Sequence, residues 1–129
     1  MKVELSPTEN IERIRKLEIR EFVEYLPDKE PSSSYITYDI RRGGLFIGWL
    51  RLKTGASNVV EISVFFINKE HRQQGIGRAI ILALQTKWTR IHYPAGDSRV
   101  ITLLERAGFK KVKDGSDDGV HSHWVWEAS

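Results

Sequence analysis

The stretch EHRQQGIGRAIILALQ, residues 70–85, places two glycines, Gly75 and Gly77, where a polar segment becomes an apolar helix. Glycine is among the poorest helix formers, so helix stability does not explain these two residues. A residue without a Cβ lets a ligand approach the backbone closely, and the free N–H groups and positive dipole end at a helix start favour an anion. The stretch therefore predicts an anion-binding loop. The alternative is a strand-to-helix turn that only tolerates glycine.

Two well-known phosphate loops do not fit this stretch. A Walker loop needs Gly-Lys-Ser/Thr, which is absent here. A Rossmann fingerprint needs a third glycine at the position that Ile80 occupies. What remains is a shorter pattern, RQQGIG, at residues 72–77.

The segments around this loop alternate between strand and helix patterns. Residues 59–67, VVEISVFFI, are β-branched and aromatic, which predicts a central strand covered on both faces. Helical spacing of apolar residues predicts a helix from Gly75 to about Trp88. Residues 6–9, SPTE, form a capping box with proline at the first helical position, and they predict that an earlier helix begins there.

The remaining segments complete a sheet. Expected strands lie at residues 1–5, 35–40, 45–53, 90–96, 109–115 and 121–127. Asp97 or Ser98 caps a last helix that Gly108 ends. The predicted order is β α β β β α β α β β, in one domain of α/β (α+β) class that spans residues 1–129.

Composition narrows the function classes. The formal net charge of +3 is too small for a nucleic-acid tail. The chain has no cysteine, which excludes disulfides, thiolate metal sites and cysteine nucleophiles and predicts a reducing cytoplasm. The N-terminus lacks an apolar leader and no stretch is long enough to span a bilayer, so neither export nor a membrane partner is expected.

The pattern RQQGIG resembles the [Q/R]-x-x-G-x-[G/A] pyrophosphate loop of the GNAT family of acetyl-CoA-dependent N-acetyltransferases. The preceding EISVFFINKEH, residues 61–71, resembles the fourth strand of that family. LLERAGFKKV, residues 103–112, resembles its late helix followed by Gly-Phe. The order of elements also matches, so the resemblance covers nearly the whole chain. It implies a mixed, mostly antiparallel central sheet flanked by helices.

The resemblance implies acetyl-CoA as the cofactor. Main-chain groups of Phe65 and Ile67 would hold the pantetheine arm, as a strand edge accepts an extended partner. Arg72, Arg78 or Lys87 would bring positive charge to the phosphates. The backbone amides that would bind the pyrophosphate belong to Gln73, Gln74, Gly75, Ile76, Gly77 and Arg78.

Glu61 is the candidate general base. It lies fourteen residues before Gly75, which is the spacing of a general-base glutamate in histone acetyltransferase-like members of the family. It also interrupts an apolar run, where partial burial would make a carboxylate a better base. The alternative is a carboxylate near water at a strand end, or one paired with an arginine.

The general acid departs from the family pattern. Many members carry a tyrosine four residues before the Gly-Phe, and this chain has Leu104 there. Asp97 stands where an asparagine is common. Tyr93, Ser98 or water would serve as the proton donor instead. The alternative for Tyr93 is an ordinary strand residue without a catalytic role.

Other polar and aromatic groups carry weaker signals. His121 and His123 share one strand face, but no third ligand accompanies them, so no metal site is predicted. Trp124 and Trp126 are expected in the core or at an interface. Residues 41–42, two arginines in a hairpin turn, are expected to be solvated.

The sequence therefore predicts an N-acetyltransferase that moves an acetyl group to a primary amine, on a small molecule or a protein, by direct attack. The alternative, motivated by Leu104, is a degenerate domain that binds acetyl-CoA or a protein partner without efficient turnover. A nucleic-acid partner is disfavoured, and a homodimer is left open.

Overall fold

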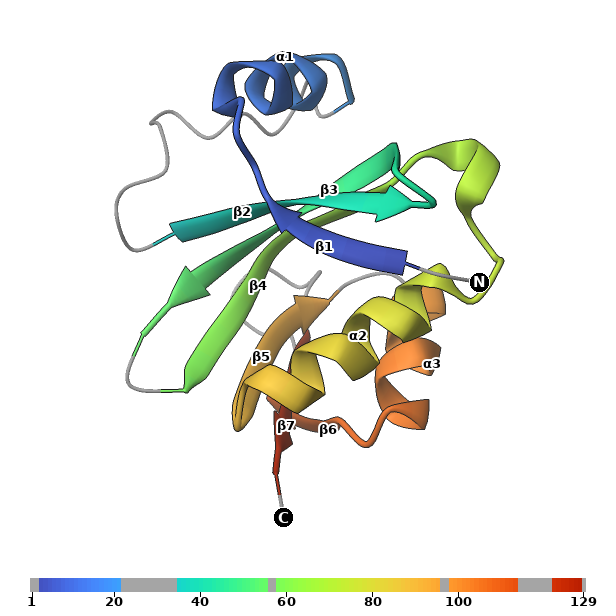
Figure 1. The fold of residues 1–129 in the computed structure, drawn as a ribbon. Coiled ribbons are helices and arrows are strands. Elements are labelled where there is room, and N and C mark those ends of the chain that lie inside the picture. The colour runs from blue at the N-terminus through green and yellow to red at the C-terminus, as the bar shows by residue number, and fades with distance from the viewer. Residues whose placement is uncertain (1–2, 22–34, 56–57, 96–97, 114–121, 129) are drawn as a thin grey trace.

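The computed structural model describes residues 3–21, 35–55, 58–95, 98–113 and 122–128. The order of strands and helices is the predicted one (Figure 1). The elements are β1 (Val3–Pro7), α1 (Ile11–Glu21), β2 (Tyr35–Arg42), β3 (Leu45–Thr54), β4 (Val59–Ile67), the 3-10 helix η1 (Lys69–His71), α2 (Ile76–Lys87), β5 (Arg90–Ala95), α3 (Ser98–Arg106), β6 (Lys110–Lys113) and β7 (Ser122–Glu127).

The strands form one seven-stranded sheet in the order β1-β2-β3-β4-β5-β7-β6. All neighbouring strands are antiparallel except β4 and β5, which run parallel. The mostly antiparallel sheet predicted from the sequence is confirmed, and β4 is its central strand.

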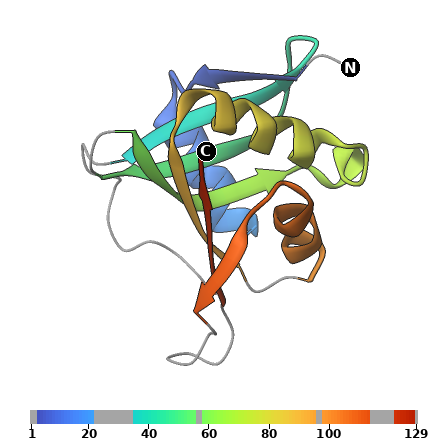
Figure 2. The same cartoon turned by 90° about the horizontal axis from the view of Figure 1, so that it is seen from below.

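Helices cover both faces of this sheet. α1 lies against one face, and α2 and α3 lie against the other (Figures 1 and 2). The main core fills the space beneath α2 and α3, where Ile76, Ile80, Ile81, Leu84 and Leu104 meet the strands. None of the helices in the described part of the chain has the length and apolar character that crossing a bilayer requires.

The most buried strand is β3 rather than β4. Residues 47–52 of β3 are all buried, whereas in β4 only Val60 and Ile62 are. α1 contacts side chains of β2 and β3, through Arg13 to Asp39 and to the ring of Phe46. The expectation that residues 59–67 are covered on both faces is therefore wrong. On the face opposite α2 and α3, the covering helix α1 lies over β2 and β3 rather than over β4.

The first helix begins later than its capping box predicted. Ser6 and Pro7 belong to β1, where they pair with β2. β1 is an edge strand, and an edge strand tolerates a proline that cannot donate to a ladder. Asn10 precedes the helix instead, and its side-chain Oδ1 accepts a hydrogen bond of 3.1 Å from the backbone N–H of Arg13. Strand pairing thus overrides the local capping signal.

The later helix ends follow the sequence more closely. α2 begins directly after Gly75, which is left-handed with φ of 79°, and ends before Trp88. α3 is followed by Gly108, with φ of 90°, as a glycine that ends a helix should be. Asp97 lies outside the described residues, as do the segments at 22–34 and 114–121.

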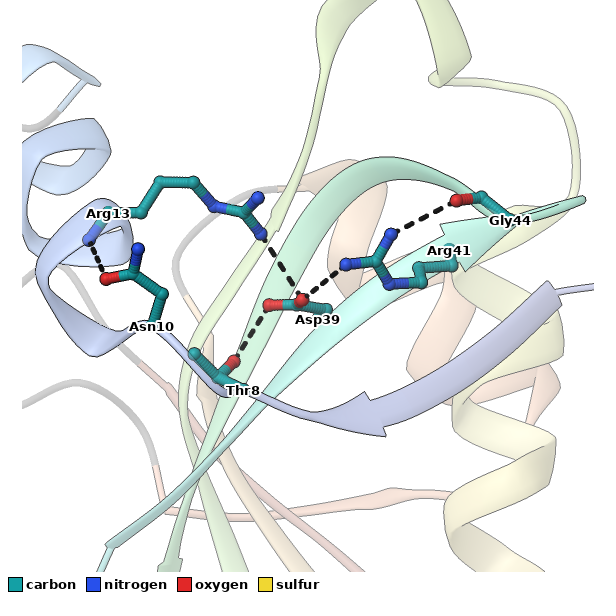
Figure 3. A network of polar contacts seen from close by, with 6 residues as sticks. All are labelled: Thr8, Asn10, Arg13, Asp39, Arg41 and Gly44. Carbon is teal, nitrogen blue, oxygen red and sulfur yellow. Dashed lines mark hydrogen bonds and ion pairs between the residues drawn. The ribbon is translucent and has the colours of Figure 1, made fainter.

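A polar network holds α1 to the sheet (Figure 3). The carboxylate of Asp39 on β2, with a side chain only 6% exposed, accepts hydrogen bonds from three groups. These are the Thr8 hydroxyl at 2.9 Å, the Arg41 guanidinium at 2.9 Å and the Arg13 guanidinium at 3.3 Å. A buried carboxylate needs such partners, and here they come from β2 itself, α1 and the segment between β1 and α1.

Candidate functional site: a diverging strand pair and a helix start

β4 and β5 are paired over only part of their length. Their register contains three pairs, and the last joins Glu61 to His92. β4 then continues to Ile67 and β5 to Ala95, and Figure 1 shows the two strands spreading apart. From residue 62 onward, one backbone edge of β4 therefore has no strand partner within the described residues.

The opposite edge of β4 is fully engaged with β3. The N–H of Asn68 donates to the carbonyl of Ile47 at 2.7 Å. A Cβ on Gly48 would lie 2.1 Å from the carbonyl oxygen of Phe66, so only glycine fits there. Because strand backbone groups alternate in direction, the main-chain groups of residues 65 and 67 point to the unpaired edge.

One of these groups already has a partner. The carbonyl of Ile67 accepts a hydrogen bond of 2.7 Å from Nε of Arg72. The same guanidinium lies 5.0 Å from the ring centroid of Phe66. Arg72 thus fixes the loop after β4 to the end of that strand, a structural task that the sequence did not reveal.

The loop before α2 has the backbone of an anion site. Gln73 and Gly75 both have positive φ, of 61° and 79°. The first hydrogen bond of the helix runs from the N–H of Ala79 to the carbonyl of Gly75 at 3.1 Å. The amides of residues 73–78 donate no hydrogen bond within the described part of the chain. Unpaired amides at a helix start, next to left-handed residues, form a concave site where a phosphate is favoured.

Side chains bring one further cation to this loop. Nη1 of Arg42, at the end of β2, donates to Oε1 of Gln74, and Nε2 of Gln74 donates to the carbonyl of Glu70 at 2.9 Å. The expectation that Arg42 is only solvated is therefore wrong. No local sequence signal could have found this contact, because the two partners are thirty-two residues apart.

Three other predicted loop residues have distinct places. Ile76 is buried in the core, so its side chain points away from solvent, and Arg78 is exposed. Lys87 occupies the opposite end of α2, about 16 Å along the helix from its first residue. Its Nζ lies 3.3 Å from the hydroxyl of Tyr38. Lys87 therefore does not belong to this loop, contrary to expectation.

Glu61 stands at the point where the strands part. It is partly buried, next to His92 in the register of β4 and β5 and to Lys53 in that of β3 and β4. Nδ1 of His92 lies 2.9 Å from Nε2 of His123 on β7. Sequence reasoning missed His92, and it considered His123 only as a partner of His121, which lies outside the described residues.

Burial lowers the pKa of His92 below that of free imidazole, and the neighbouring positive charges of His123 and Arg90 lower it further. The carboxylates of Glu61 and Glu127 act in the opposite direction. The His92 imidazole is therefore neutral at pH 7. Within the described residues no three groups of His, Cys, Asp or Glu gather in a way that could hold a metal ion.

Of the predicted proton donors, Tyr93 does not lie on the face of Glu61. Tyr93 follows His92 in β5, so its side chain faces the core, where it is packed beside the buried Trp124. Ser98 is the first residue of α3, and its side chain lies outside the described set. Leu104 is fully buried and serves the core.

Residues 4–109 match the model of the acetyltransferase (GNAT) family. The chain therefore belongs to the GNAT acetyltransferase family, whose cofactor is acetyl-CoA. The comparison with curated proteins found no match.

Solved structures agree on the fold. An acetyltransferase from Thermus thermophilus has a TM-score of 0.72 at 16% identity, covering 98% of this chain and 97% of its own. Spermidine/spermine N-acetyltransferase SpeG from Vibrio cholerae, solved as mutant forms, has a TM-score of 0.77 at 14% identity, covering 97% and 93%. PaiA N-acetyltransferase from Thermoplasma acidophilum, in complex with coenzyme A, has a TM-score of 0.68 at 15% identity, covering 98% and 99%.

Proposed function

We propose that this chain is an acetyl-CoA-dependent N-acetyltransferase that acts on a primary amine, in a small molecule or a protein. The observation that carries the proposal is the adjacency of two sets of backbone groups that no neighbouring strand or helix pairs with. One is the run of amides at residues 73–78, and the other is the unpaired edge of β4 within the described part of the chain. The loop follows β4 in the chain, and the unpaired edge begins next to Glu61, the last residue of β4 that pairs with β5.

These groups fit coenzyme A. The amides of Gln73 to Arg78 would bind the pyrophosphate, with the guanidinium of Arg42 beside them through Gln74. Main-chain groups of Phe65 and Ile67 would hold the pantetheine arm in the manner of an added strand. Because Arg72 already donates to the Ile67 carbonyl, that oxygen would be shared. When bound, acetyl-CoA supplies an acetyl thioester, which is an electrophile for amines.

Glu61 would take the proton of the acceptor amine. Its carboxylate is partly buried at the divergence of β4 and β5, and it belongs to the sheet face opposite the core residues Val60 and Ile62. A base placed there would reach an amine that arrives from the side of α1. The name of the Vibrio cholerae neighbour, a spermidine/spermine N-acetyltransferase, supports an amine acceptor. A chain without cysteine fits a reducing compartment such as the cytoplasm.

The second candidate is a domain that binds acetyl-CoA or a protein partner without efficient turnover. Leu104 favours it, because this fully buried side chain occupies the place of the usual acid. Tyr93 and Ser98 stay as candidate proton donors. Transfer without a strong acid is slower but feasible, since a thiolate is a tolerable leaving group.

Two measurements on the wild-type protein separate these candidates. Acetyl-CoA should raise the melting temperature, since a ligand at a hundred times its Kd stabilises the native state by about 2.7 kcal/mol. Thiol release from acetyl-CoA should then appear with at least one member of a panel of polyamines, aminoglycosides and lysine peptides. A thermal shift without thiol release would favour the binding domain. The lack of a thermal shift would contradict the enzyme and an acetyl-CoA-binding domain, and would leave only a domain that binds a protein partner.

A further inference from the structure

The strongest unassigned feature is the hydrogen-bonded pair of imidazoles beside Glu61. We infer that His92 is a second catalytic base, which accepts a proton from the acceptor amine at its Nε2 atom, and that His123 is a positioning residue that holds the His92 ring. This inference rests on the proposed function and deepens it.

The strand register places the pair on the face where an acceptor would arrive. His92 is in register with Glu61, and neighbours in a parallel pair point to the same face. Ile91 is buried in the core on the other face. His123 is paired with Pro94, two residues beyond His92, so it belongs to the face of His92 as well. Three titratable side chains thus share one face at the point where β4 and β5 part.

The contact between the rings allows two tautomers, of which the proposed base requires the one in which His92 donates. The two nitrogens are 2.9 Å apart and the ring planes are inclined by 58°, so one N–H lies between Nδ1 of His92 and Nε2 of His123. When Nδ1 of His92 donates this hydrogen, the lone pair of the His92 ring is on Nε2. This tautomer leaves Nε2 as a base, while His123 restrains rotation of the ring.

Burial and the surrounding charges keep the His92 imidazole neutral at pH 7. The groups that face His92 among the described residues are Glu61 from β4, Arg90 from β5, and His123 and Glu127 from β7. Together with burial they leave the pKa of His92 below the ordinary imidazole value. His92 is therefore unprotonated at neutral pH and releases a captured proton readily, and it is only partly buried, so water can take that proton.

The proposed step is a proton transfer and needs no co-reactant. One N–H bond of the acceptor ammonium breaks, its electron pair stays on the amine nitrogen, and an N–H bond forms at Nε2 of His92. The imidazolium then passes this proton to water, which restores the neutral ring. Glu61, next to His92, stabilises the transient positive charge while its carboxylate is ionised. It then takes the second proton, which the nitrogen carries after it has attacked the thioester.

Kinetics of three variants test the inference. His92→Gln keeps a polar side chain of similar size but removes the base, so kcat/KM at pH 7 should fall roughly a hundredfold and recover as pH rises toward the pKa of the amine. His123→Val should lower kcat/KM less, because the His92 ring loses the hydrogen bond that restrains it but keeps its lone pair on Nε2. His123→Gln, which retains a hydrogen-bond acceptor, should restore most of the activity and serves as the matched control.

A second readout does not depend on activity. Long-range ¹H–¹⁵N spectra of the wild-type protein above pH 7 should show His92 as the Nδ1–H tautomer. A pH titration of the same signals should give His92 a pKa below that of free imidazole. His92 as the Nε2–H tautomer would overturn the inference, whatever the variants do. If the wild type acetylates an amine and His92→Gln keeps its rate and pH profile, the inference fails and the proposed function stands. If the wild type transfers no acetyl group, both fail.

Discussion

A Cβ built on Gly77 would lie 3.2 Å from Cδ2 of Leu103, so the second glycine of the loop faces α3. The two glycines at the start of α2 are therefore required for different structural reasons. Gly75 adopts the left-handed backbone that shapes the loop, whereas Gly77 lets two helices approach each other. The amides of both glycines belong to the proposed pyrophosphate loop, but only Gly75 has a backbone conformation that requires glycine there.

The Gly77 and Leu103 contact predicts a coupled effect on stability. Gly77→Val should lower the free energy of unfolding by about 1–3 kcal/mol, because the added methyl groups crowd the Leu103 side chain. In a Leu103→Ala background the same change should cost at least about 0.5 kcal/mol less. A double-mutant cycle by urea denaturation measures this coupling, and strictly additive effects would show that the two positions do not touch.

Gly75 predicts a change in cofactor binding. Gly75→Val should abolish the rise in melting temperature caused by acetyl-CoA, because a β-branched residue is strained at φ of 79° and fills space beside the loop amides. Gly75→Asn is the matched control, since asparagine tolerates left-handed backbone. Asparagine should retain part of the shift. A full shift in the valine variant would remove this loop from the cofactor site.

Glu61→Gln separates a catalytic from a structural carboxylate. The amide keeps the shape but removes the base, so turnover at neutral pH should fall roughly a hundredfold while acetyl-CoA still raises the melting temperature. The rate should recover at higher pH, where the amine arrives neutral. Steady-state kinetics and thermal shifts on the same sample provide the check. Lost stability with unchanged turnover per folded molecule would indicate a structural residue.

Asp39→Asn should loosen α1 from the sheet. The neutral amide leaves two guanidinium groups, of Arg13 and Arg41, without their shared carboxylate, at a cost of about 1.5–3 kcal/mol. Amide hydrogen exchange within residues 11–21 should rise in parallel. Glu127→Gln breaks the exposed pair with Arg90 and should cost less than about 1 kcal/mol. Equal costs for the two variants would contradict the anchoring role of Asp39.

His92 predicts a pH dependence of stability. Its pKa is lower in the folded chain than in the unfolded one, so below about pH 6.5 the unfolded chain binds more protons. The stabilising contribution is complete above that pH and is lost as pH falls toward the folded pKa. Melting temperatures between pH 5 and 8 should therefore fall less on acidification in His92→Gln than in wild type. Identical pH dependence in both proteins would show that His92 does not titrate abnormally.

Local pattern was sufficient for much of the fold. The strand composition of residues 59–67, the helical spacing after Gly75 and the helix-ending Gly108 are properties of neighbours in the chain, and each is found where it was predicted. The family loop at residues 72–77 could be recognised for the same reason. The prediction that a helix begins at residues 6–9 was wrong because the first of these residues pair with β2. This pairing with a distant strand is not visible in the local pattern of the capping box.

The sequence by itself determined the order of the elements and the glycine loop, because periodicity and turn chemistry act over a few residues. It offered Glu61 as a candidate base through the resemblance to the family and the apolar run that this residue interrupts. Only the tertiary structure decided that His92 meets His123 across thirty-one residues and that Arg42 meets Gln74 across thirty-two. The first contact depends on the register of β5 against β7, and the second on where a hairpin end comes to lie beside the loop. Register and strand divergence are set by the packing of the whole sheet, so no single stretch of sequence contains them.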